Sequence, residues 1–234
     1  MTIEVYAFRW VPTFAQGYVR DLRIRWALEE AGTPFEVRLI GLDERETPQY
    51  RALQPFGQIP AYREDGVEMF ESGAVVLHLM EKHQALAPGD AAGRARATCW
   101  VVAALNSVEP SMLEFLSCKA GLERGEAWAE ARQLAVLQRL EQRLAGVSTW
   151  LGGRDYLEDR FTAGDLMMAC VIRELIPSGV ISRFPNLEAF CARCEARPAF
   201  KRALDAQMAA YREHAPDQGT PLPKGEGGAR EAGG

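Results

Sequence analysis

The chain has 234 residues with a formal net charge of −5, and 47% of the residues are hydrophobic, which is enough apolar material for one large domain or two small ones. The acidic balance and the scattered arginines argue against a nucleic-acid partner. The start of the chain lacks a basic segment followed by an apolar one, and the longest apolar runs are far shorter than a bilayer span, so we expect a cytoplasmic protein without membrane contact.

The first third of the sequence alternates between strand and helix patterns. The predicted elements are a strand at 3–8, a helix at about 18–31 ended by Gly32, a strand at 35–40, a short helix at 47–53, a strand at Pro60, a hairpin turn at Asp65-Gly66, a strand at 68–70 and a helix after Ser72. This order predicts a small mixed sheet covered by helices, as in a thioredoxin-like domain.

The rest of the chain is dominated by long amphipathic segments. After a connector at 84–92, rich in Ala, Gly and Pro, helices are predicted at 94–118, 127–144, 166–175, 187–196 and 199–211. We therefore expect a thioredoxin-like α/β domain at 1–83, a linker at 84–92, an all-α domain at 93–214 and, because 215–234 is rich in Gly and Pro, a disordered tail.

Two motifs carry the functional signal. In Gln54-Pro-Phe-Gly-Gln-Ile-Pro60, the proline cannot donate to a sheet ladder. A cis bond before Pro60, which is cheap for proline, would leave the amide and carbonyl of Ile59 free to pair with an extended peptide. In Phe70-Glu-Ser-Gly73, Ser72 supplies a hydroxyl and free N–H groups at a helix N-terminus, where a carboxylate is favoured. Glu71 beside it is suited to an ammonium group. A peptide-like strand next to an amino-acid head group describes γ-glutamyl-cysteinyl-glycine, which is glutathione.

With these motifs at this spacing, the chain from Ile3 to about His214 resembles the cytosolic glutathione S-transferase family, in its bacterial form. Thr162 and Asp165, which match a capping box in a recurring folding element of that family, add to the resemblance. The resemblance implies the glutathione S-transferase fold, with glutathione as co-substrate and no metal. It also implies a homodimer that joins the glutathione thiolate to a small apolar electrophile, a detoxification reaction.

Within that family, the glutathione contacts carry over to five residues. The Ile59 backbone is expected to pair with the cysteinyl unit after the turn at Pro60. Glu71 and Ser72 are expected to hold the γ-glutamyl end, and Gln58 the glycyl end.

The sequence offers several candidates for the group that activates the thiol. The family places a Tyr, Ser or Cys after the first strand, but the loop at 9–17 contains neither Ser nor Cys. Three hydroxyls are alternatives: Tyr18, which falls near the serine of serine-type members, Thr13 in the loop, and Tyr6 in the first strand. Backbone N–H groups or Gln16 are further candidates.

The second substrate is expected between the first domain and the first long helix of the second. Trp10, Phe14, Met112 and Phe115 are the candidate walls. The sequence leaves open a glutathione-dependent isomerase, dehalogenase, ether-cleaving enzyme or peroxidase on the same fold, and also a glutathione-binding protein without turnover.

The cysteines favour a structural role. Five cysteines are an odd number, typical of reduced thiols. Cys191 and Cys194 match the C-x-x-C pattern but lie inside a predicted late helix, with no further zinc ligands nearby. We therefore interpret them as buried helix thiols.

Overall fold

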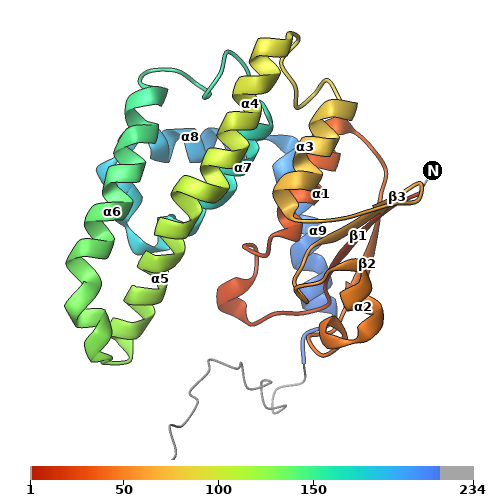
Figure 1. The fold of residues 1–234 in the computed structure, drawn as a ribbon, viewed down its shortest axis with the longest axis horizontal. Coiled ribbons are helices and arrows are strands. Elements are labelled where there is room, and N and C mark those ends of the chain that lie inside the picture. Colours follow the sequence, from red (N-terminus) through yellow and green to blue (C-terminus); the bar gives the residue numbers. More distant parts are fainter. Residues whose placement is uncertain (1, 217–234) are drawn as a thin grey trace, which may run out of the picture.

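In the computed structural model, residues 2–216 are described. The first domain is built on a four-stranded sheet with the order β2-β1-β3-β4 (Figure 1). Its strands are β1 (Ile3–Phe8), β2 (Glu36–Ile40), β3 (Ala61–Glu64) and β4 (Val67–Phe70). Strand β2 runs parallel to β1, whereas β3 is antiparallel to both β1 and β4. The predicted small mixed sheet is confirmed.

Three helices cover this sheet: α1 (Asp21–Ala31), α2 (Pro48–Leu53) and α3 (Ser72–Lys82). Because side chains alternate along a strand, β1 sends Ile3 and Val5 into the core shared with α1 and α3. Its Tyr6 and Phe8 pack instead with Tyr50 of α2. The short helix α2 covers only part of its face, so the outer rows of that face remain open to water.

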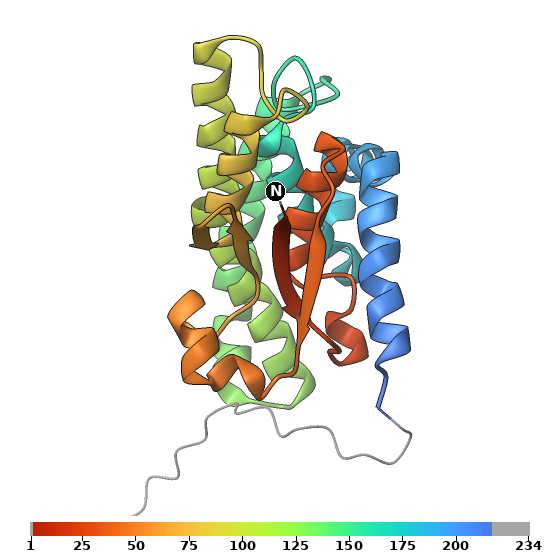
Figure 2. The same cartoon turned by 90° about the vertical axis from the view of Figure 1, so that its right-hand side faces the viewer.

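The second domain is helical. Its α-helices are α4 (Ala91–Ala103), α5 (Glu109–Glu123), α6 (Ala127–Leu151), α7 (Ala163–Ile172), α8 (Pro185–Glu195) and α9 (Pro198–Glu213). A π-helical turn, Ala104–Val108, joins α4 to α5. Helix α9 returns to lie alongside α1 (Figure 2). None of the helices within residues 2–216 is long and apolar enough to cross a membrane.

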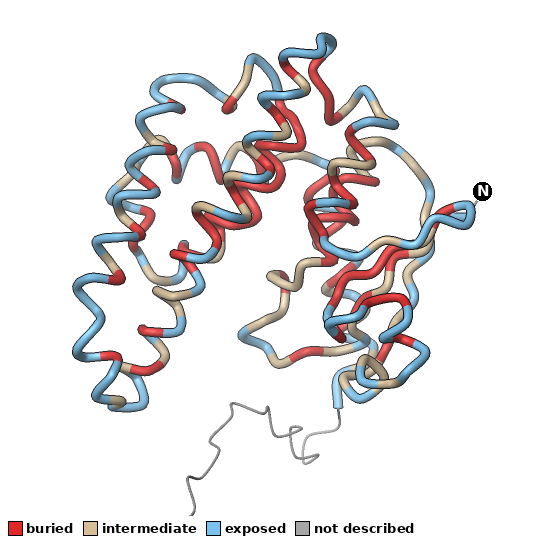
Figure 3. Tube along the Cα trace, in the orientation of Figure 1, coloured by how far each residue is buried: buried red, intermediate tan, exposed pale blue. Residues whose placement is uncertain are grey.

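The two domains share one hydrophobic core. Every residue of α7 is buried, and α7 contacts both α1 and α4. Buried segments lie in both domains (Figure 3), and the buried residues of α7 and α1 belong to one hydrophobic cluster. The faces that the two domains turn toward each other are therefore held in a fixed relation.

The predicted capping box opens α7. Thr162 accepts the amide of Gly164, and Asp165 accepts the amides of Thr162 at 2.9 Å and of Leu157 at 2.7 Å. Burial raises the pKa of Asp165 to about 6, although these hydrogen bonds oppose the shift. The prediction of this box is confirmed.

Several predicted boundaries were wrong. The helix expected from about 18 begins at Asp21, because Gly17 has φ +81° and the preceding segment forms a 3-10 turn, Thr13–Ala15. The helix expected at 94–118 begins at Ala91, where Asp90 accepts the Gly93 amide at 2.7 Å, and it is interrupted by the π turn. Most of the tail expected at 215–234 lies outside the described residues.

Candidate functional site

Three adjoining pockets form one cleft where the first domain faces α5 and the segment after α7. We call them the α3 pocket, which contains Ser72, the middle pocket, which contains Phe8 and Arg45, and the apolar pocket, which contains Leu116. The α3 and middle pockets share Arg20, Gln58 and Ile59. The middle and apolar pockets share Tyr18, Val19 and Glu174. Through these shared walls, an elongated ligand can run from the N-terminus of α3 to α5.

The α3 pocket is built around the start of α3. Ser72 is the first residue of this helix and is buried, and the cap residue Glu71 makes no side-chain cap hydrogen bond. The N-cap of α3 is therefore Glu71, the residue between the end of β4 and Ser72. Glu71 has φ +68°, unusual for a residue with a side chain, and such strain is often retained at binding sites.

Close packing behind Ser72 depends on Gly73. A Cβ atom at Gly73 would lie 2.3 Å from Cδ1 of Leu105, in the π turn of the other domain. The glycine thus lets the start of α3 approach the second domain, and Leu105 becomes a wall of the α3 pocket.

A buried charge cluster lies beside Ser72. Arg23 donates to the Ser72 hydroxyl at 3.3 Å and to the Glu109 carboxylate at 2.7 Å. Arg20 donates to the same Glu109 oxygen at 3.0 Å. Burial raises the pKa of Glu109, but the guanidinium groups of Arg23 and Arg20 outweigh this and hold the pKa below its ordinary value. With two cations and one anion, the cluster carries a net positive charge that favours a ligand carboxylate.

Sequence reasoning missed this cluster. Arg23 is 2% exposed within α1, among apolar neighbours. A charged residue on the predicted buried face of a helix was the available signal, since such residues are rarely buried without a partner. The partner, Glu109, is 86 residues away in sequence.

The bond between Ile59 and Pro60 is cis, as the sequence allowed. Ile59 precedes the first paired residue of β3, Ala61. Within residues 2–216, neither its amide nor its carbonyl makes a hydrogen bond. The carbonyl of the preceding residue, Gln58, accepts a hydrogen bond from the Tyr50 hydroxyl at 2.7 Å, which holds the loop against α2. The backbone of Ile59 is available to an extended ligand.

The middle pocket lies at the start of α1. Tyr18 lines it, and the Arg173 guanidinium stacks over the Tyr18 ring at 4.7 Å. The backbone amides of Val19 and Arg20 find no acceptor among the described residues. A hydroxyl, free amides and the positive end of a helix therefore meet at one place, an arrangement that favours an anion.

The other candidates for thiol activation lie elsewhere. Thr13 is exposed and lines none of the three pockets. The side-chain amide of Gln16 donates to the Val11 carbonyl at 3.0 Å. Tyr6 lies on the other face of the sheet, in a separate pocket beneath α2. Of the three candidate hydroxyls, the structure brings only that of Tyr18 to the cleft.

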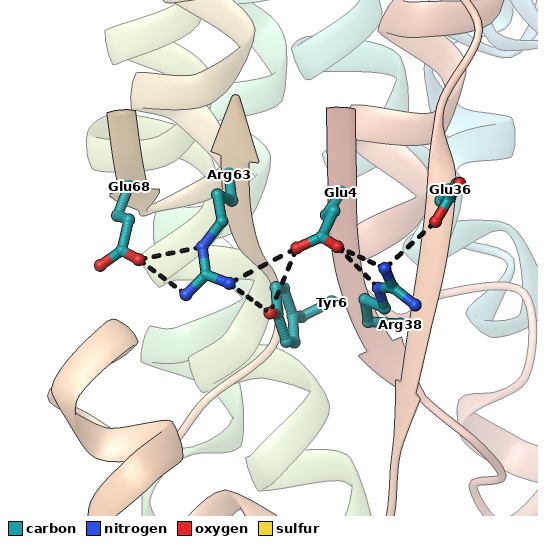
Figure 4. Close-up of polar contacts among 6 residues, drawn as sticks. All are labelled: Glu4, Tyr6, Glu36, Arg38, Arg63 and Glu68. Atoms are coloured by element: carbon teal, nitrogen blue, oxygen red, sulfur yellow. Dashed lines mark hydrogen bonds and ion pairs between the residues drawn. The ribbon is translucent and has the colours of Figure 1, made fainter. Parts of the chain in front are cut away.

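The surroundings of Tyr6 form a charged row across the sheet (Figure 4). Strand register places Glu36, Glu4, Arg63 and Glu68 opposite one another. Like charges at Glu4 and Glu36 would repel, but Arg38 bridges them at 2.6 Å and 3.2 Å. The Tyr6 hydroxyl is held between Glu4 and Arg63, at 3.4 Å and 3.3 Å. Burial is the main reason that the pKa of Tyr6 is raised, which opposes a role as an acid.

The apolar pocket has a volume of about 510 Å³, within the range of ligand pockets. From the loop after β1, the predicted wall Phe14 lines it and is 84% exposed. Trp10 is half-buried and lines none of the three pockets.

The predicted α5 walls, Met112 and Phe115, line none of the three pockets. Met112 is fully buried in the core, and Phe115 packs partly against α6. At about 100° per residue, these positions are rotated by roughly 60° and 120° from Glu109. The face turned to the cleft carries Glu109, Leu116 and Ala120.

Glu174 is the remaining polar wall of the cleft. It lies in the 3-10 helix Arg173–Ser178, directly after α7, and lines both the middle and the apolar pocket. Burial raises the pKa of its carboxyl to about 7. Nothing in the sequence pattern indicated this residue, since its position depends on the packing of α7.

The cysteines take no part in the cleft. Cys191 and Cys194 are completely buried, and burial raises the pKa of both thiols, which disfavours the reactive thiolate. Among residues 2–216, no three His, Cys, Asp or Glu side chains gather in a way that could hold a metal ion.

Comparisons with known proteins point in one direction. The sequence profile described as "Glutathione S-transferase, N-terminal domain" matches residues 22–88. The chain is 30% identical over 207 residues to "Glutathione S-transferase F11" of Arabidopsis thaliana, which covers 81% of this chain and 93% of that protein. It is 29% identical over 202 residues to a "Glutathione S-transferase" of Hyoscyamus muticus, with 79% and 92% covered. Among solved structures, a glutathione transferase of Burkholderia graminis with two glutathione molecules bound per subunit superposes with a TM-score of 0.74. It is 28% identical and the match covers 88% of each chain.

Proposed function

Since this chain belongs to the glutathione S-transferase family, we propose that its cleft holds glutathione along the α3 and middle pockets and a small apolar electrophile in the apolar pocket. The protein is a glutathione transferase, and the reaction joins the thiolate sulfur of glutathione to the electrophile.

The γ-glutamyl end fits the α3 pocket. Its carboxylate is suited to the Ser72 hydroxyl, the free amides at the start of α3 and the net positive charge of the cluster around Arg23. Its ammonium group is suited to the carboxylate of Glu71, which lines the same pocket.

The remaining parts of glutathione follow the shared walls. The cysteinyl unit pairs with the free amide and carbonyl of Ile59, which Pro60 follows. The glycyl carboxylate lies toward Gln58 and Arg45, which line the middle pocket. Arg45 was not foreseen from the sequence, but its guanidinium supplies the charge that Gln58 lacks.

The sulfur then reaches the start of α1. There the Tyr18 hydroxyl and the free amides of Val19 and Arg20 favour the thiolate over the thiol. Phe14, Leu116 and Ala120 give the electrophile an apolar surface on the far side of Tyr18.

One observation carries this proposal: the free backbone of Ile59 and the Ser72–Arg23 pair open into the same pocket. Calorimetric titration with glutathione, and with cysteinyl-glycine as a control lacking the γ-glutamyl group, tests it. Binding of glutathione alone, with turnover of chlorodinitrobenzene, supports the proposal. Equal, weak binding of both peptides overturns it.

We also propose that the protein acts in the cytoplasm as a homodimer that removes reactive electrophiles. Phe56 and Phe70 are 61% and 37% exposed and pack edge to face at 5.9 Å. Val102 of α4 is 50% exposed, and α4 lies on the same side of the molecule as β4 (Figure 2). Pairing of two copies would cover these apolar groups. Sedimentation equilibrium of the parent protein and of Phe56→Ser tests this, and a monomeric parent protein contradicts it.

A further inference from the structure

We propose that Glu174 donates a proton to the second substrate and so selects electrophiles in which an oxygen gains a proton as the carbon–sulfur bond forms. This inference rests on the proposed function, because it assumes that glutathione occupies the α3 and middle pockets. It adds a residue whose contribution differs between kinds of electrophile.

Glu174 lies where two pockets adjoin. It lines the middle pocket together with Ile59 and the apolar pocket together with Leu116. Among the residues that the structure describes, the walls common to both pockets are Tyr18, Val19 and Glu174. A thiolate beside Ile59 and an electrophile against Leu116 therefore meet next to this carboxyl.

The surroundings of Glu174 leave its carboxyl free. The neighbouring cation Arg173 is bound to other groups, since it donates to the Gly17 carbonyl at 2.6 Å and to Glu195 at 2.7 Å. Across the cleft, the guanidinium groups of Arg20 and Arg23 are bound to Glu109. Within residues 2–216, no hydrogen bond or ion pair reaches the Glu174 carboxyl.

The protonation state fits the role. Burial is the main reason that the pKa of Glu174 rises to about 7, and the charge of Glu109 adds to it. The charges of Arg23, Arg20 and Arg173 oppose the shift but are partly neutralised by their own partners. Near neutral pH, a large share of the carboxyl carries a proton that it can donate, which is the condition for efficient general acid catalysis.

The chemical step balances without any further reactant. With an α,β-unsaturated ketone, the thiolate sulfur forms a bond to the β-carbon, and the π electrons of the C=C bond move toward the carbonyl oxygen. The Glu174 O–H bond breaks as this oxygen takes the proton, and the resulting enol tautomerises to the ketone in water. The carboxylate is then reprotonated by the thiol proton of the next glutathione or by water. With an aryl halide, chloride leaves and no proton is taken up, so this step has no use for Glu174.

Turnover of two electrophiles separates proton donation by Glu174 from a general effect of this residue on the cleft. The ratio of kcat/KM for methyl vinyl ketone to that for chlorodinitrobenzene is measured in the parent protein, in Glu174→Gln and in the exposed control Glu188→Gln. We expect Glu174→Gln to lower this ratio about 100-fold. In the parent protein the ratio should also decrease above about pH 7, where Glu174 loses its proton, and this decrease should be absent in Glu174→Gln. The control should keep the parental ratio and pH profile. A parental ratio and pH profile in Glu174→Gln overturn the inference.

A binding experiment gives a readout without turnover. S-butylglutathione and the glutathione adduct of methyl vinyl ketone differ mainly in one carbonyl oxygen. In the parent protein, we expect calorimetry to show the adduct favoured by about 3–10-fold near pH 6 and by less near pH 8. Glu174→Ala should remove this preference, and a preference that persists in Glu174→Ala overturns the inference. If the parent protein binds neither conjugate nor glutathione, the proposed function itself is wrong. If both conjugates bind equally at both pH values, only the role of Glu174 is wrong.

Discussion

Arg23 of α1 donates to the hydroxyl of Ser72, the first residue of α3, across 3.3 Å. Its other nitrogen binds Glu109 of α5 at 2.7 Å. One buried guanidinium thus joins elements of both domains at the point where the proposed ligand carboxylate enters. Because Ser72 accepts from Arg23, its own O–H is oriented to donate into the pocket.

This arrangement predicts a separation of affinity from stability in Ser72→Ala. Loss of a hydroxyl donor to a carboxylate should weaken glutathione binding by about 1.5–3 kcal/mol. The melting temperature should change less, because the cap residue of α3 is Glu71 and not Ser72, and the free protein loses only the 3.3 Å contact with Arg23. Calorimetry and thermal unfolding measure the two effects. Ser182→Ala, an exposed site outside the cleft, serves as the control. Unchanged affinity with a lower melting point would contradict the binding role.

Backbone strain at Glu71 gives a second prediction. Glu71→Gly relieves the cost of a positive φ, about 1–2 kcal/mol, but makes the unfolded chain more flexible. We expect unchanged or slightly increased stability together with weaker glutathione binding, because the carboxylate for the ammonium group is lost.

The matched control is Asp65→Gly. Asp65 has φ +47° and lies in the hairpin turn, outside the three pockets of the cleft. It should show the same kind of stability change with parental affinity. If both variants bind glutathione like the parent protein, Glu71 is not part of the site.

The ionisation of bound glutathione tests the role of Tyr18. Tyr18→Phe keeps the ring and its contact with Arg173 but removes the hydroxyl. The pKa of bound glutathione should rise by about one to two units, since one hydrogen bond to a charged group contributes about 1.5–3 kcal/mol. Ultraviolet thiolate absorbance, followed against pH, measures this shift.

Tyr6→Phe and Thr13→Val are the comparison variants, because their hydroxyls lie away from the cleft. Both should titrate like the parent protein. A parental titration in Tyr18→Phe as well would leave the amides of Val19 and Arg20 as the stabilising groups.

The pH dependence of stability provides a fourth prediction. The pKa of Glu174 is about 7 in the folded protein against an ordinary value of 4.5, so the folded state holds this proton over a range where the unfolded state releases it. The stabilisation is fully present below pH 4.5 and is lost as the pH rises through about 7. The unfolding free energy of the parent protein minus that of Glu174→Gln should therefore fall over this window and level off above it. Denaturant unfolding at several pH values measures it, and a constant difference would show that the carboxyl is already ionised.

The sequence alone determined most of the fold and half of the site. Alternating apolar residues and turn residues predicted the strands around Pro60 and Phe70, because these signals are local. The same holds for the capping box of Thr162 and Asp165. The glutathione motif could be recognised because Pro60, Glu71 and Ser72 lie close together in sequence.

Tertiary structure decided what depends on distant partners. Whether Tyr6 or Tyr18 faces the cleft depends on which side of the sheet α2 covers. Which residues of α5 line the cleft depends on the rotation of this helix about its axis, and the local periodicity near Met112 did not determine that rotation. The pairing of Arg23 with Glu109 and the elevated pKa of Glu174 arise only when α1, α5 and the segment after α7 meet. Burial and long-range charge pairing are properties of the packed molecule, so a local pattern can indicate that Arg23 needs a partner but cannot identify Glu109.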